Sequence, residues 1–250
     1  MSEKYPIKKI SIIIPCYNEQ EGIPFLKTKL QPALDALSQS FAVEVIFIDD
    51  GSSDNTYTLL KETFGSGYKI IKHPKNMNLG AALRTGLQNS TGDVICAVDS
   101  DCTYDPMILK DMIALISSDV DIVSAAAFHP KGKIVADIPK YRIFLSKSIV
   151  AIYNILLAKK YYSYTCMVRA YKREVIKSIN YKSDDFLAMA EIMITALLKG
   201  YKVYEFPATS NVRQYGSSKI RLFGVIRAHT GFVLKLLFAR LTGVNLWLKK

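Results

Sequence analysis

The stretch Gly92-Asp93-Val94-Ile95-Cys96-Ala97-Val98-Asp99-Ser100-Asp101 decides the fold of this chain. Five consecutive apolar residues, 94–98, are typical of a parallel strand that is buried on both faces. Two carboxylates follow directly, at Asp99 and Asp101. Because ligands of open α/β sheets bind beyond the carboxyl ends of the strands, the stretch predicts a binding site as well as a strand.

Three further apolar runs, at 11–15, 43–48 and 68–71, have the same character. Carboxylates or amides follow them, in Asn18-Glu19, in Asp49-Asp50 and in Asn76-Met77-Asn78. Helix-like stretches at about 20–38, 54–64 and 79–90 separate the runs. This alternation predicts an α/β fold, with a mostly parallel sheet and helices on both faces.

Composition agrees with a large buried core. The chain has 250 residues, half of them apolar. Its four cysteines form no Cys-x-x-Cys pair, which favours unpaired thiols in a reducing compartment. The polar first nine residues do not have the pattern of a secretory signal peptide.

Charge is distributed unevenly along the chain. Residues 1–128 hold 11 Lys and Arg against 16 Asp and Glu, whereas residues 129–250 hold 22 against 6. A basic half of this kind is suited to nucleic acid, an anionic membrane surface or a phosphate-bearing substrate. Since no helix-turn-helix, zinc-finger or RNP-like signature is present, we expect no nucleic-acid partner.

Apolar patterning in the basic half favours a membrane surface. Residues 148–158 are strongly apolar but too short to span a bilayer, which needs about 20 apolar residues. In the segment 219–241 a helical wheel separates an apolar side from a basic one. The apolar side holds Ile226, Val233, Leu237 and Leu241, and the basic side holds Arg221, Arg227 and Lys235. Basic amphipathic helices lie in the membrane interface; the alternative is a pair of ordinary core-facing helices with solvated lysines.

Asp99 and Asp101 are candidate ligands of a hard divalent cation. Carboxylate oxygens suit Mg²⁺ or Mn²⁺, and such ions usually bind substrate phosphates as well. The alternative is a solvated pair of aspartates in a turn.

Five motifs in one order carry a family resemblance. They are Ser11-Ile-Ile-Ile-Pro-Cys-Tyr-Asn-Glu19, Asp49-Asp-Gly-Ser-Ser-Asp-Asn-Thr56, Asn78-Leu-Gly-Ala-Ala-Leu-Arg84, Asp99-Ser-Asp101 and Arg213-Gln-Tyr-Gly-Ser-Ser-Lys219. Together they resemble a family 2 glycosyltransferase of the dolichol-phosphate mannose synthase type. The resemblance implies a GT-A catalytic domain over 1–218, with an acceptor- and membrane-facing insertion at about 129–165. Residues 219–250 are then a C-terminal interfacial amphipathic helical segment.

The same resemblance implies the reaction. The expected enzyme is peripheral at the cytoplasmic membrane face and moves a hexose from a nucleotide-sugar to a polyprenyl or dolichyl phosphate, with inversion. GDP-mannose is the first expected donor and UDP-glucose the second. A saccharide or other soluble acceptor is an alternative, weakened because the Gln-x-x-Arg-Trp signature is missing and the only tryptophan is Trp247. A non-catalytic, membrane-associated protein that binds nucleotide-sugars is another.

The resemblance also assigns site residues. The nucleoside pocket is expected at Pro15, Tyr17, Glu19, Ile48, Asp49 and Asp50. The donor and metal site comprises Asp99, Ser100 and Asp101. Thr103 stands where the family often has a metal-binding glutamine, which leaves the third protein ligand open.

Acceptor binding is implied for Arg142 and Ser146, which are spaced by one helical turn. Arg213, Ser217 and Lys219 are expected in a loop that closes over the phosphates. The expected catalytic set is Asp101, Arg213, Lys219 and Glu191. Glu191 is expected either to orient a loop arginine or to act as a base. A solvated stripe along its helix is the alternative for Glu191.

Overall fold

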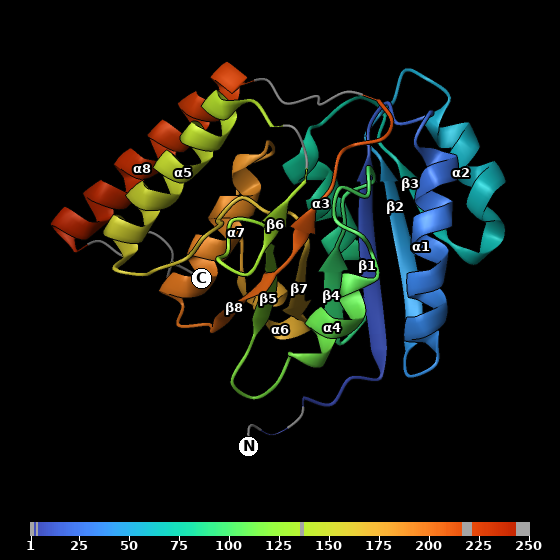
Figure 1. The fold of residues 1–250 in the computed structure, drawn as a ribbon, viewed down its shortest axis with the longest axis horizontal. Helices are drawn as coiled ribbons and strands as arrows, with labels where there is room; N and C mark the ends of the chain where they lie inside the picture. Colours follow the sequence, from blue (N-terminus) through green and yellow to red (C-terminus); the bar gives the residue numbers. More distant parts are fainter. Residues whose placement is uncertain (1–2, 4, 136–137, 217–221, 244–250) are drawn as a thin grey trace.

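The computed structural model describes residues 3, 5–135, 138–216 and 222–243. A seven-stranded sheet in the order β3-β2-β1-β4-β7-β5-β8 forms its centre (Figure 1). The strands are β1 (Lys9–Cys16), β2 (Ala42–Asp49), β3 (Lys69–Lys72), β4 (Val94–Ala97), β5 (Ile122–Ala126), β7 (Arg169–Lys172) and β8 (Val203–Pro207). Only β7 pairs antiparallel with its neighbours in this sheet, β4 and β5. The predicted mostly parallel sheet is therefore confirmed. Two short strands, β6 (Lys133–Ile134) and β9 (Thr209–Ser210), pair separately.

Helices cover both faces of the sheet. One face carries α1 (Ile23–Ser38), α2 (Thr56–Phe64) and α4 (Ile108–Ala114). The other face carries α3 (Leu79–Asn89), α6 (Arg173–Ser178) and α7 (Leu187–Leu198). A single 3-10 turn, η1 (Gly65–Gly67), follows α2.

Alternation along β1 explains why residues 12–16 of this strand are all apolar. Ile12 and Ile14 pack in the core beneath α1, whereas Ile13 between them packs beneath α3. Gly86 lets α3 approach this closely, because a Cβ atom there would lie 2.3 Å from Ile13 Cγ2. A strand buried on both faces therefore has no polar position to reveal its period.

A pair of long helices, α5 (Lys140–Leu157) and α8 (Leu222–Thr242), lies side by side at one end of the molecule (Figure 1). They pack on α7 through a third core cluster that includes Tyr153, Phe232 and Leu236. The Tyr153 hydroxyl lies 2.8 Å from His229 Nδ1, and Arg240 donates to the Ile155 carbonyl at 3.0 Å. The two helices thus run in the same direction.

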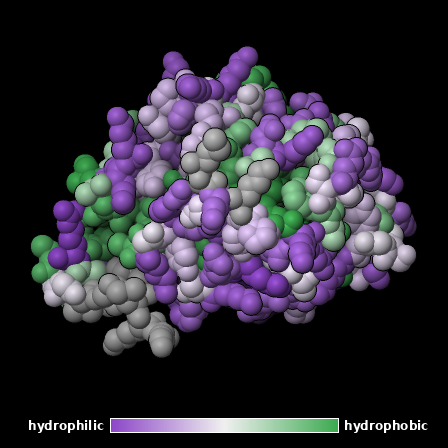
Figure 2. All heavy atoms as spheres, turned by 90° about the horizontal axis from the view of Figure 1, so that it is seen from below, coloured by the Kyte–Doolittle hydropathy of each residue, from purple (hydrophilic) through white to green (hydrophobic). Residues whose placement is uncertain are grey.

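Much of the apolar surface of this pair is not covered by protein (Figure 2). Ile155 and Leu241 are 73% and 84% exposed, and Phe144 is 69% exposed. The predicted apolar side of residues 219–241 faces outward at Ile226, Leu237 and Leu241, so the core-facing alternative holds only for a buried stripe containing Phe232 and Leu236. By length and composition alone, α8 is the one described helix that passes the criterion for crossing a membrane, with a mean hydropathy of 1.5.

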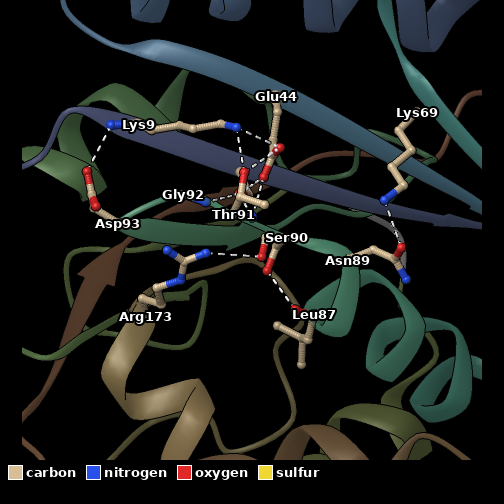
Figure 3. A network of polar contacts seen from close by, with 11 residues as sticks. Lys9, Glu44, Lys69, Leu87, Asn89, Ser90, Thr91, Gly92, Asp93 and Arg173 are labelled. Atoms are coloured by element: carbon tan, nitrogen blue, oxygen red, sulfur yellow. Dashed lines mark hydrogen bonds and ion pairs between the residues drawn. The ribbon is translucent and has the colours of Figure 1, made fainter.

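A polar network closes the end of the sheet where β1 and β4 begin (Figure 3). Glu44 on β2 accepts hydrogen bonds from Ser11 and from both the backbone and the hydroxyl of Thr91, and it pairs with Lys9 at 3.0 Å. Asp93 accepts from the backbone amides of residues 8 and 9. Burial acts to raise the pKa of Glu44, but these hydrogen bonds outweigh it and lower the pKa to about 2.

Glu44→Gln is expected to lower the free energy of unfolding by about 1–2 kcal/mol at pH 7, since the group is partly screened by solvent. A depressed carboxyl pKa contributes stability above its unfolded value of 4.5, and this contribution is lost as pH falls toward 2. The difference between wild type and variant should therefore shrink at pH 3. Urea unfolding at both pH values measures it, with the exposed Glu62→Gln as control. An undiminished difference at pH 3 would contradict the assignment.

Candidate active site

A cleft of about 1210 Å³ opens at the carboxyl ends of β1 and β4. These strands are neighbours, yet β1 leads through α1 to β2 on its other side. Such a reversal of strand order leaves a crevice between the diverging connections. Predicted site residues that line the cleft are Pro15, Tyr17, Glu19, Asp50, Asp99, Ser100, Asp101, Thr103, Arg142 and Arg213.

A tight turn after β4 brings two carboxylates to the cleft. Cys102 adopts a left-handed conformation with φ of 52°, and its amide donates to the Asp99 carbonyl at 3.3 Å. Asp101 Oδ1 accepts from the Thr103 amide at 3.0 Å, which fixes the second carboxylate. Left-handed backbone is uncommon for residues other than glycine and gathers at functional sites. Asn18 and Asn78, also at the cleft, likewise have positive φ, of 51° and 72°.

Negative charge accumulates at this turn. Removal from bulk water raises the pKa of Asp99 above its usual range, the charge of Asp101 raises it further, and Arg213 acts in the opposite direction. Among the described residues, no group of three or more His, Cys, Asp or Glu side chains converges on one point. The two carboxylates, with Thr103 also lining the cleft, nevertheless offer oxygen donors of the hard kind that Mg²⁺ and Mn²⁺ prefer. A cation there would offset the charge that raises the pKa of Asp99.

Arg213 joins the ends of β1 and β4. Its guanidinium donates to both carboxylate oxygens of Glu19 at 2.6 Å and to Asp101 Oδ2 at 3.1 Å. Nε donates to the carbonyl of Tyr215 at 2.7 Å, and the Tyr215 ring packs on Phe25 with centroids 5.6 Å apart. The segment 211–216 is thereby held over the cleft, and its arginine fork partly neutralises the acidic floor.

A buried histidine supports the cleft at the end of β2. His73 Nδ1 lies 2.7 Å from Asp50 Oδ1, and Nε2 lies 2.9 Å from the Thr85 hydroxyl. Asp50 also accepts from the Met77 amide at 2.9 Å, and burial raises its pKa. Sequence reasoning missed His73, which stands just beyond β3 with no motif around it.

Two predicted nucleoside-pocket residues do not line the cleft. Ile48 is fully buried in the core beneath α3. Asp49, also fully buried, accepts from the Ser52 amide at 3.2 Å, and its Oδ2 has no hydrogen-bond partner in the described part of the chain. Side chains alternate in direction where a strand ends, so of the two adjacent aspartates only Asp50 faces the cleft.

Glu191 was expected in the catalytic set, but its side chain lies outside the cleft lining. It is buried on α7 and accepts from the amides of Lys182 and Ser183 at 3.1 and 2.8 Å. Because the side chain is buried, the alternative of a solvated stripe is wrong for this residue. Glu191 instead fixes the segment that leads to Asp185 and Phe186, which do line the cleft.

The acceptor residues are only partly brought together. Arg142 lines the cleft near the start of α5, but Ser146, one turn further on, does not. Ser217 and Lys219 lie outside the described residues. Residues that sequence reasoning did not place at the site also line it, namely Asn76, Asn78, Ile138, Pro139, Asp185, Phe186, Gly224 and Val225. The two asparagines were visible in the sequence only as amides after a strand.

Comparison with solved structures supports the fold across nearly the whole chain. Three crystal structures of glucosyl-3-phosphoglycerate synthase from Mycobacterium tuberculosis superpose on it. The complex with Mn²⁺, UDP and glucosyl-3-phosphoglycerate has a TM-score of 0.66 at 18% identity, covering 93% of this chain and 80% of that one. The UDP complex gives 0.68 at 16%, covering 92% and 80%. The complex with Mg²⁺ and UDP gives 0.67 at 17%, covering 93% and 79%.

The family model described as Glycosyl transferase family 2 matches residues 11–179, which is more than half of the chain and extends from within β1 to beyond β7. The matched part holds both carboxylates after β4 and the residues that follow β1 and β2. The predicted GT-A fold and enzyme class are confirmed, while the finer assignment to the dolichol-phosphate mannose synthase type stays a prediction. The chain belongs to glycosyl transferase family 2 and is a glycosyltransferase.

Proposed function

We propose that this enzyme transfers a hexose, mannose from GDP-mannose, to a polyprenyl or dolichyl phosphate at the cytoplasmic face of a membrane. One observation carries the proposal. The cleft that holds Asp99 and Asp101 also includes residues at the starts of both exposed apolar helices, Arg142 on α5 and Gly224 on α8. An acceptor with a phosphate head and an apolar tail fits a polar cleft that opens beside the N-terminal ends of two exposed apolar helices.

Asp99, Asp101 and Thr103 are the residues that would hold a divalent cation. When bound, such an ion supplies Lewis-acid stabilisation of the departing nucleoside diphosphate. Arg213, which contacts Asp101 in this structure, turns toward the same diphosphate and stabilises its charge as the sugar leaves. The donor nucleoside lies along Tyr17, where an aromatic ring can stack on a base.

The acceptor needs little activation by a base. A phosphate monoester is already anionic at neutral pH, and Arg142 offers it a bidentate fork. Attack on the anomeric carbon from the side opposite the diphosphate forms the new carbon–oxygen bond as the old one breaks, with inversion. The position of Glu191 away from the cleft fits this scheme, because no proton has to be removed.

A second candidate is transfer of glucose from UDP-glucose to a small, soluble phosphorylated acceptor. The similar structures support it, since that synthase was crystallised with UDP-glucose and with phosphoglyceric acid. At 16–18% identity, these structures support the fold of this chain but do not establish its substrate. Arg142 suits either kind of acceptor phosphate.

One incubation distinguishes these functions. The protein is mixed with labelled GDP-mannose or UDP-glucose, Mg²⁺ or Mn²⁺, and either a short polyprenyl phosphate or 3-phosphoglycerate, with and without chelator. We expect label from GDP-mannose in an organic-extractable, mild-acid-labile product that chelator abolishes. Label only in a water-soluble product with phosphoglycerate would establish the second candidate, and no transfer to either acceptor would overturn both.

Membrane association belongs to the same proposal, and the exposed apolar helix pair supports it. Ile155→Glu with Leu241→Glu is expected to reduce binding to anionic lipid vesicles at least about tenfold, because burying each large apolar side chain contributes roughly 1.5–3 kcal/mol. Sedimentation with vesicles measures the effect. Met107→Glu, which charges an exposed apolar residue just before α4, is the control and should bind normally.

Unchanged sedimentation of the double variant would contradict an interfacial role for the pair. Release of the wild type by alkaline carbonate separates peripheral attachment from a membrane-crossing α8. We expect release.

A further inference from the structure

A second cavity, of about 480 Å³, is separated from the active-site cleft by segment 180–186. It is formed between α3, α6 and α7 on one face of the sheet. Its apolar wall includes Ile95, Ile176 and Ile192, and its polar wall includes the amides of Gln88 and Asn180. Apolar walls with a few polar groups are typical of sites for small organic molecules.

The rim of this cavity is cationic. Arg84, Arg173 and Lys177 line it, and no acidic side chain does. Arg84 pairs with Asp184 at 2.7 Å, so its charge is partly offset. Neither Arg173 nor Lys177 has an ion-pair partner among the described residues. The Arg173 guanidinium donates to the carbonyl of Ser90 at 3.4 Å (Figure 3). Its charge also acts on Asp93, whose pKa is lowered mainly by the amides of residues 8 and 9 and further by Arg173.

We infer that this cavity binds a small organic phosphate whose apolar or aromatic body is compact. Two unpaired cations from one helix, Arg173 and Lys177, match the charge of a phosphate dianion, and the arginine fork fits two of its oxygens. Leu87 and Ile176 line the cavity and are only partly buried, so they provide accessible surface for the apolar body. The ring of Tyr181 forms a further wall, with the Arg84 guanidinium 4.7 Å from its centroid.

The wall that this cavity shares with the active-site cleft is segment 180–186. Asn180 and Tyr181 face the cavity, and Asp185 and Phe186 face the cleft. The segment is pinned to α3, because the Gly80 amide donates to the Asp184 carbonyl at 2.6 Å and the Tyr181 hydroxyl donates to the Gly80 carbonyl at 2.8 Å.

Helix α3 and segment 180–186 are packed closely at Gly80. A Cβ atom at Gly80 would lie 2.4 Å from the Ser183 carbonyl oxygen. Arg84 holds the same segment through Asp184 and, at 3.1 Å, through the Ser183 carbonyl. A bound molecule whose body packs against Tyr181 and Arg84 therefore alters the support of Asp185 and Phe186, and so acts as an effector of donor binding. Such coupling between two sites is reciprocal.

Calorimetric titration with phenyl phosphate tests the site directly. We expect saturable binding to wild type that weakens about tenfold in Arg173→Gln and in Lys177→Gln, since each loses one charge-assisted contact. Lys110→Gln, which removes an exposed charge from α4 on the other face of the sheet, should bind as wild type does. Arg142→Gln, in the cleft, should also bind normally.

Three results would overturn the site. They are no binding to wild type, equal binding by all four variants, or loss of binding in Arg142→Gln alone, which would place phenyl phosphate in the cleft. Phenol and inorganic phosphate are titrated separately, and each should bind more weakly than phenyl phosphate. Phenol lacks the phosphate for Arg173 and Lys177, and inorganic phosphate lacks the apolar body.

The effector role rests on the proposed function, whereas the binding titration does not. Phenyl phosphate at saturation is expected to change the Michaelis constant for the nucleotide-sugar at least about fivefold in wild type, and not in Arg173→Gln. If the effector binds and wild type transfers sugar with an unchanged Michaelis constant, the effector role is wrong. If no transfer occurs at all, the proposed function fails while the binding site stands.

Discussion

Asp101→Asn is expected to lower the rate of sugar transfer by about 1000-fold or more, with the fold retained. The change keeps the size of the side chain and the acceptor for the Thr103 amide, so the turn after β4 is preserved. What it removes is the negative charge that faces Arg213 and that, with Asp99, would hold a divalent cation. The loss should therefore appear in turnover and in metal dependence rather than in stability.

The measurement is the transfer rate over a range of Mn²⁺ concentrations, with thermal unfolding recorded in parallel. Asp105→Asn is the matched control, because it makes the same exchange at a neighbouring residue that does not line the cleft. Asp105 accepts from the Met107 amide, and asparagine can do the same. Wild-type rates in Asp101→Asn would remove this carboxylate from the mechanism.

Arg213→Ala is expected to reduce turnover about 100-fold or more while leaving vesicle binding unchanged. Its guanidinium contacts two carboxylates at once, Glu19 after β1 and Asp101 after β4. Removal leaves the acidic floor without that charge, and the diphosphate then meets uncompensated repulsion. Transfer and vesicle sedimentation are measured on the same preparation.

Arg213→Lys separates charge from geometry. Lysine restores a positive charge but not the fork that contacts two carboxylates at once, so we expect only partial recovery of the rate. Equal loss in both variants would show that the fork itself is required. Full activity in Arg213→Ala would exclude the arginine from charge stabilisation.

The strands of the sheet were predictable where a run of apolar residues indicates burial on both faces. Apolar runs predicted β1, β2, β3 and β4 to within two residues at every end, because a strand covered on both faces must be largely apolar. β7 gave no such signal. It contains Arg169, which is fully buried and donates to Ser124 and to the carbonyls of Tyr164 and Met189. Two of those partners, Ser124 and Met189, lie 45 and 20 residues away in the chain, where no local pattern reveals them.

The candidate site was predictable to the same extent. Asp99, Asp101 and Glu19 stand directly after strands, so their place at the carboxyl edge follows from the strands themselves. The distinction between Asp49 and Asp50 depends on the residue at which β2 ends, and a shift by one reverses it. Glu191 and His73 depend on tertiary partners, at 182–183 and at Asp50, that only the folded chain brings within reach.

The account depends most on one arrangement, in which the carboxylates after β4 and Arg213 meet the phosphates of the donor in a single cleft. Electron paramagnetic resonance of free Mn²⁺, recorded as the protein is titrated with GDP or UDP, tests it most directly. We predict that wild type binds Mn²⁺ tightly only with the nucleoside diphosphate, and that Asp101→Asn loses this binding. Equal uptake of Mn²⁺ by Asp101→Asn and wild type would contradict it.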